Sequence, residues 1–209
     1  LVAVAAAAVA FVAVGPAPAS AQQTPQSGQC VACHMRQPEE RLLAPARDFD
    51  RDVHAERGLG CLDCHGSASA DPASTATGFI RKPPRASIPA LCARCHSDAG
   101  LIRGYNPSLR IDQFAEYVSS IHGRRLFERG DTAVAVCVDC HPAHRTLPPS
   151  DPASSVFPLN VAETCGRCHA DPVRMADHEG GTGQLELWRR GTLGHEWGEG
   201  RRNRSHHGG

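Results

Sequence analysis

The segment Cys61-Leu62-Asp63-Cys64-His65 joins two cysteines, three residues apart, to a histidine that directly follows the second one. The pattern Cys-x-x-Cys-His occurs five times and uses all ten cysteines of the 209-residue chain. In chain order, the copies are motif 1 (Cys30, Cys33, His34), motif 2 (Cys61, Cys64, His65), motif 3 (Cys92, Cys95, His96), motif 4 (Cys137, Cys140, His141) and motif 5 (Cys165, Cys168, His169). A random order of the same residues would give about 0.03 such matches. The five copies therefore share one chemical role.

This pattern is typical of covalent c-type haem attachment. Two thiols on one turn of chain can each form a thioether with a haem vinyl group, and the next histidine is then held under the iron as its proximal ligand. We therefore predict five covalently bound haems, attached through the ten cysteines, with the five motif histidines as iron ligands.

Three other uses of paired cysteines fit less well. Zinc ribbons do not require a histidine after every pair, and disulfide frameworks do not space cysteines in five identical pairs. A thioredoxin-like redox motif would occur once, next to a βαβ pattern, which this sequence lacks.

The composition predicts a small core of side chains. The chain has six Phe, two Trp and two Tyr, but 20 Gly and 16 Pro, so side-chain burial alone would hardly offset the entropy of folding. We expect the porphyrins to supply much of the apolar core and the fold to be mostly α and irregular, a small multihaem cytochrome c fold of short helices and long loops with little or no sheet. Apolar residues at helical spacing predict one helix over 113–129, and proline-rich segments predict loops over 66–89 and 142–158.

The order and spacing of the motifs indicate an internal duplication. Each of two units contains an apolar residue followed by histidine, a Cys-x-Asp-Cys-His motif, an Asp-Pro-Ala-Ser loop and a Cys-x-Arg-Cys-His motif. The paired motifs begin 31 residues apart in the first unit and 28 in the second. The shared loop and upstream histidine favour a true repeat over chance likeness between haem motifs.

The first 15 residues are apolar and rich in alanine, and a small-x-small site, Ala19-Ser20-Ala21, follows them. This pattern predicts a signal peptide, and the alternative, an uncleaved membrane anchor, is disfavoured because the run is short for a bilayer. The predicted organisation is a partial, cleaved signal peptide (1–21), an N-terminal segment with motif 1 and His54 (22–60), a two-haem module (61–112), a second such module (113–178) and a flexible Gly/Arg/His-rich tail (179–209).

The second axial ligands are expected to be mostly histidines. Twelve histidines less the five in the motifs leave seven, whereas the chain has only two methionines. Met35 follows the proximal His34 and cannot reach the opposite face of that haem, while Met175 stays possible. The candidates for the distal positions are His54, His122, His144, His178 and His195.

His144 is the most informative of these candidates. It lies three residues after His141, on the same side of that haem, and can therefore reach only a different haem. The alternative is a solvated histidine or one that bonds a propionate. His54 and His122 occupy matching places in the two units, which favours them over the histidines of the tail.

The run Ser120-Ile121-His122-Gly123, with Cys137-Val-Asp-Cys-His-Pro-Ala-His144 and Cys165-Gly-Arg-Cys-His after it, resembles the multihaem cytochromes c of anaerobic respiration. These include small pentahaem periplasmic electron donors and cytochromes with doubled Cys-x-x-Cys-His units. The resemblance covers about residues 28–178 and implies a helical and irregular fold around a chain of haems with bis-histidine iron. After His178 the sequence departs from this pattern.

The net charge and the number of available histidine ligands limit which functions fit this sequence. The formal net charge is zero, but haem propionates would make the holoprotein acidic by roughly five to ten charges. This disfavours nucleic acid and suits docking to basic patches on redox proteins, such as a quinol dehydrogenase, a terminal reductase or another multihaem cytochrome, with membrane association only through a partner. We expect an exported electron carrier, periplasmic or extracellular, rather than an enzyme. The alternatives are a nitrite-type oxyanion reductase, which needs an open iron position, and a haem subunit of a quinol-oxidising or filament-forming complex.

Overall fold

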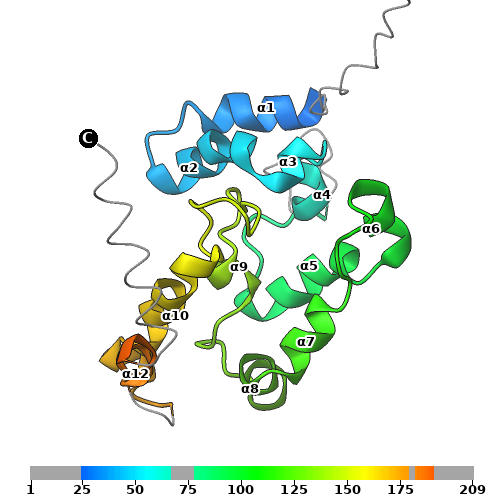
Figure 1. Ribbon diagram of the computed structural model, residues 1–209. Coiled ribbons are helices and arrows are strands. Elements are labelled where there is room, and N and C mark those ends of the chain that lie inside the picture. Colours follow the sequence, from blue (N-terminus) through cyan, green and yellow to red (C-terminus); the bar gives the residue numbers. More distant parts are fainter. Residues whose placement is uncertain (1–24, 67–77, 179–181, 191–209) are drawn as a thin grey trace, which may run out of the picture.

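The computed structural model describes residues 25–66, 78–178 and 182–190 (Figure 1). The α-helices are α1 (Pro25–His34), α2 (Glu40–Asp48), α3 (Val53–Glu56), α4 (Cys61–His65), α5 (Ile88–His96), α6 (Ala99–Tyr105), α7 (Gln113–Ser119), α8 (Ile121–Arg129), α9 (Cys137–Cys140), α10 (Val161–His169), α11 (Pro172–Met175) and α12 (Gln184–Arg190). Three 3-10 turns, Phe49–Arg51, Arg85–Ser87 and Pro158–Asn160, connect them. These residues contain no strand, which confirms the expected mostly α and irregular fold.

The cysteines of all five motifs lie on helices, but the motifs occupy two different ends. Motifs 2 and 4 begin their helices, because the aspartate between the cysteines accepts a hydrogen bond from the backbone N–H before the first cysteine: Gly60 to Asp63 at 2.6 Å and Val136 to Asp139 at 2.7 Å. A carboxylate is favourable at this end of a helix. Motifs 1, 3 and 5 end their helices, and motifs 3 and 5 carry arginine in the last turn, where a cation is favourable. In motifs 2 to 5, the residue just before the second cysteine thus differs with the end of the helix that carries the motif.

The helix expected over 113–129 is divided in two at Ser120. Ser120 has an extended backbone (ψ 164°) and caps α8 by accepting a hydrogen bond from the N–H of Gly123 at 3.1 Å. Gly123 lies so close to α7 that a Cβ there would come within 2.0 Å of the Tyr117 carbonyl oxygen. The prediction of one continuous helix was therefore wrong, because a capping serine and a close backbone approach turn the chain at this point.

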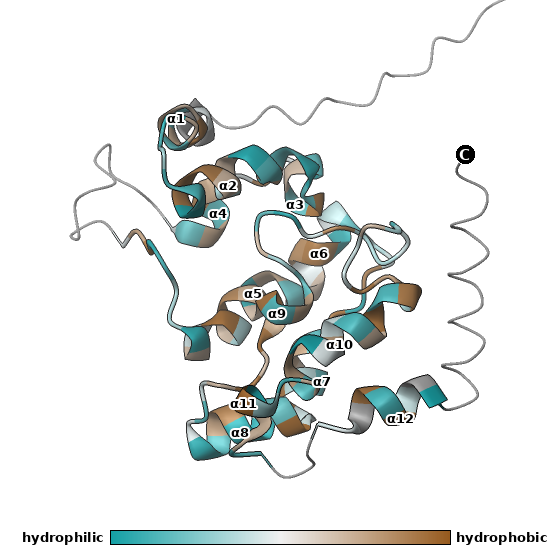
Figure 2. Cartoon of the chain, turned by 90° about the vertical axis from the view of Figure 1, so that its left-hand side faces the viewer, coloured by the Kyte–Doolittle hydropathy of each residue, from teal (hydrophilic) through white to brown (hydrophobic). Residues whose placement is uncertain are grey.

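The core of side chains is small. The buried apolar residues of the described chain are Ile102, Leu126, Val134, Val136, Leu147 and Ala162. Leu126, Val134 and Val136 form one cluster, with Ile88, Tyr117 and Val138 packed against it. Apolar and polar stretches alternate along the helices (Figure 2). Such a core agrees with a protein that relies on a bound apolar group for part of its interior.

Several predictions concern segments that the structure describes only in part or not at all. The predicted signal peptide, 1–21, lies outside the described residues, and the division into modules stays a prediction. The loop expected over 66–89 ends earlier, since α5 begins at Ile88. Within the segment 179–209, Gln184–Arg190 is helical and contacts α10, a helix that the sequence did not predict. No helix in the described parts is both long and apolar enough to cross a bilayer.

Candidate functional site

The five motifs lie next to one another in the order of the sequence. Helix α1, with motif 1, contacts α4, which is motif 2. The Arg94 guanidinium of motif 3 donates to the carbonyl oxygens of Asp63 and Cys64 in motif 2, at 3.3 and 3.2 Å. Motif 3 is therefore anchored directly to the backbone of motif 2.

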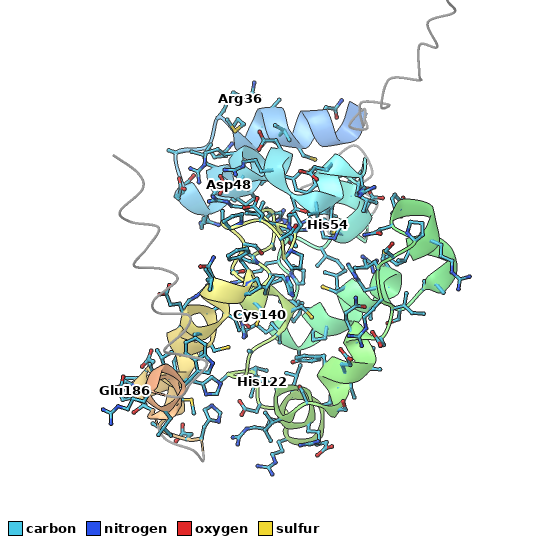
Figure 3. All side chains as sticks on the ribbon, viewed as in Figure 1. Arg36, Asp48, His54, His122, Cys140 and Glu186 are labelled. Atoms are coloured by element: carbon cyan, nitrogen blue, oxygen red, sulfur yellow. The ribbon has the colours of Figure 1, made fainter. Side chains whose placement is uncertain are left out.

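The series continues through motifs 4 and 5. The thiols of Cys92 and Cys137 form a hydrogen bond, which raises the pKa of Cys92 and lowers that of Cys137. Cys140 of motif 4 interacts electrostatically with Cys165 of motif 5, although burial is the main reason that the pKa of Cys140 is raised. In Figure 3, His54, Cys140 and His122 follow one another from the upper to the lower part of the molecule. Attachment points in this arrangement form a continuous series.

Three motif histidines each face a histidine from another part of the chain. The ring centroids are 6.1 Å apart for His54 and His96, 5.9 Å for His65 and His144, and 6.0 Å for His122 and His169. Histidine nitrogens bind metals at about 2 Å, so an iron between two imidazoles would hold their ring centroids roughly 6 Å apart. All three pairs have the ring separation that one iron between two imidazoles would require.

The pairing follows the duplication. In each unit, the histidine upstream of the first motif faces the proximal histidine of the second motif: His54 faces His96 and His122 faces His169. His144 instead crosses between the units and faces His65 of motif 2. It therefore lies opposite a motif other than its own, the position predicted for it, while ligation itself stays a prediction.

Hydrogen bonds orient several of these rings. Nδ1 of His34 lies 2.8 Å from the Leu42 carbonyl oxygen, and Nδ1 of His65 lies 2.6 Å from that of Ile80. Because a carbonyl can only accept, Nδ1 carries the proton and Nε2 keeps the lone pair that binds a metal. Metal-binding histidines are usually oriented by an acceptor at the other ring nitrogen.

Burial favours the neutral form of four histidines. It lowers the pKa of His96, His122, His141 and His144 from the usual value, and neighbouring histidines lower the first two and His144 further. Neutral imidazole is the form that binds a metal. These four side chains are thus ready to act as ligands near neutral pH.

The remaining candidate ligands do not belong to these three ring pairs. His34 and His141 do not belong to a ring pair among the residues that the structure describes. His178 lies near Asp131, with Nδ1 3.8 Å from the carboxylate. His195 lies outside the described residues. In the same described ranges, no three His, Cys, Asp or Glu side chains gather as a protein-only metal site.

Sequence reasoning missed Asp52. Its side chain is buried and accepts a hydrogen bond from Nδ1 of His54 at 2.7 Å. Burial raises the pKa of Asp52, but hydrogen bonds from His54 and from the N–H of Thr146 outweigh it and hold the pKa below its usual value. The available signal was an aspartate at the N-cap of a short helix containing a candidate ligand.

Comparison with known proteins agrees with this geometry. The model of the doubled CXXCH motif family matches residues 54–101, which include His54, motif 2 and motif 3. No curated protein and no solved structure matches the chain. The match supports a haem-binding c-type cytochrome with a role in electron transfer and implies covalently bound haem at these motifs.

Proposed function

We propose that this chain is an exported pentahaem c-type cytochrome that transfers electrons between respiratory redox partners, with iron held at most motifs between two histidines. The observation that carries the proposal is the set of three histidine pairs at about 6 Å, each joining a motif histidine to a distant one. Bound haem iron supplies one-electron chemistry, and a second imidazole lowers its reduction potential.

The residues of this chain have three tasks in that function. The ten cysteines fix the cofactors covalently, the paired histidines fill both axial positions, and contacts between successive motifs keep the attachment points close together. Filled axial positions leave no place for a substrate at motifs 2, 3 and 5, which argues against an oxyanion reductase at these sites.

The partners and the compartment belong to the same proposal. The apolar N-terminal run with its small-x-small site supports export. Propionates would add negative charge to a chain of zero formal charge, so the expected partners carry basic docking surfaces.

The haem count can be measured directly. Mass spectrometry of the mature, natively expressed protein should show five haem additions on a chain that begins at Gln22. A fully matured sample with four or fewer haems would contradict the pentahaem proposal, and a different first residue would contradict only the predicted cleavage site.

The ring angles predict two kinds of spectrum from low-spin ferric iron. The ring planes of His65 and His144 differ by 8°, whereas those of His54 and His96 differ by 83° and those of His122 and His169 by 63°. When the two imidazole planes are parallel, the iron d orbitals that overlap with the rings differ in energy. When the planes are perpendicular, these orbitals are nearly equal in energy. Electron paramagnetic resonance should therefore show at least one rhombic signal and at least two strongly anisotropic ones. A large high-spin ferric signal, or strong binding of carbon monoxide by even one reduced haem, would favour the reductase instead.

A further inference from the structure

Asp52 connects His54 to the segment that carries His144 through one buried carboxylate. The residue is 1 % exposed. Its Oδ1 accepts hydrogen bonds from the backbone N–H of His54 at 2.9 Å and from Nδ1 of the same ring at 2.7 Å. Its Oδ2 accepts a hydrogen bond at 2.7 Å from the backbone N–H of Thr146, which lies 94 positions later in the chain.

The first contact fixes the ring of His54. A carboxylate can only accept here, so Nδ1 carries the proton and Nε2 is the free nitrogen of a ring that faces His96 with centroids 6.1 Å apart. The corresponding acceptors for His34 and His65 are neutral backbone carbonyls. A charged acceptor makes an imidazole a stronger electron donor and so stabilises oxidised iron.

The second contact holds the segment that carries His144. Thr146 lies two residues after His144 and forms two hydrogen bonds with the start of α3: its N–H donates to Asp52, and its carbonyl accepts from the N–H of Val53 at 2.9 Å. His144 itself has a left-handed backbone (φ 66°), which a side chain other than glycine adopts at a cost. Asp52 therefore restrains both the ligand opposite motif 3 and the loop opposite motif 2.

We propose that Asp52 is a positioning residue that locks His54 and the His144 loop together and lowers the reduction potential of the haem bound between His54 and His96. This inference rests on the proposed function, since it requires iron at that place. Asp52 is neither part of a motif nor an axial ligand, but its charge makes the reduction potential of this one haem lower than it would otherwise be.

The test compares Asp52→Asn and Asp52→Ser with the wild-type holoprotein. Asparagine keeps the shape of the side chain but removes its charge. It also places a hydrogen-bond donor, its amide NH2 group, opposite the N–H of Thr146. Serine can still cap α3 but cannot reach the ring. The matched control is Asp151→Asn, because the Asp151 carboxylate also accepts a backbone N–H two residues along the chain, that of Ala153 at 2.7 Å, and has no hydrogen bond or ion pair with a histidine in the described chain.

Redox titration followed by visible and electron paramagnetic resonance spectra should show one midpoint potential moved upward in both Asp52 variants, on a strongly anisotropic signal. The Asp151→Asn protein should titrate like the wild type. If all five potentials are unchanged in the Asp52 variants, or if both lose haem or low-spin iron altogether, the tuning role is wrong. A wild-type protein lacking low-spin bis-histidine iron would instead refute the proposed function, so the two failures are distinguishable.

Discussion

Replacing His144 by alanine is expected to convert one haem of five to a high-spin or water-ligated form, while all five haems stay covalently attached. His144 faces His65 with ring centroids 5.9 Å apart, so its loss should remove the second axial ligand at motif 2. The cysteines of every motif remain in this variant, so the attachment chemistry is unaffected. Visible and electron paramagnetic resonance spectra would quantify the converted fraction at about one fifth, given five haems.

Two controls separate ligation from general damage. Arg145→Ala changes the next residue of the same loop and should leave the spin state of every iron as it is in the wild type. Added imidazole should restore the low-spin spectrum of a His144→Gly variant, since glycine tolerates the left-handed backbone at this position (φ 66°) and leaves space for the ring. An unchanged low-spin spectrum in His144→Ala would show that His144 is not a ligand.

The second large effect is expected from Gly123→Ala, a change of a single methyl group. The new Cβ would come within 2.0 Å of the Tyr117 carbonyl oxygen, a backbone atom that cannot move without opening the corner between α7 and α8. Overpacking typically costs 1–3 kcal/mol, and we expect a loss of about 3 kcal/mol or more in the free energy of unfolding, since the obstacle is backbone. His122 is the residue just before Gly123, so low-spin iron at motif 5 should be lost in part.

The matched control is Gly104→Ala within helix α6, where nothing lies within 4 Å of the added Cβ. Alanine is the better helix former by about 0.8–1 kcal/mol, so this variant should be as stable as the wild type or slightly more so. Denaturant unfolding of the holoproteins would compare them. Equal midpoints for the two variants would show that the close approach of α8 to α7 is dispensable.

The sequence by itself determined the chemistry of attachment and the kind of fold. The signature for covalent haem binding spans five consecutive residues, so the candidate cysteines and proximal histidines could be predicted from their immediate neighbours, and the family model agrees over motifs 2 and 3. The scarcity of large apolar residues likewise predicted the small core and the short helices. Even the end of the helix on which a motif lies has a local signal, because Asp63 and Asp139 cap helices from within their motifs.

Only the tertiary structure decided which histidines face one another. The rings of His65 and His144 come from positions far apart in the chain, and the carboxylate of Asp52 reaches Thr146 across 94 positions. Such contacts depend on how helices and loops pack, whereas a sequence pattern reports only residues within a few turns of each other. The corner at Ser120 escaped prediction for the same reason: the apolar spacing over 113–129 suits a helix, but the position of Gly123 against Tyr117 depends on two helices meeting in space.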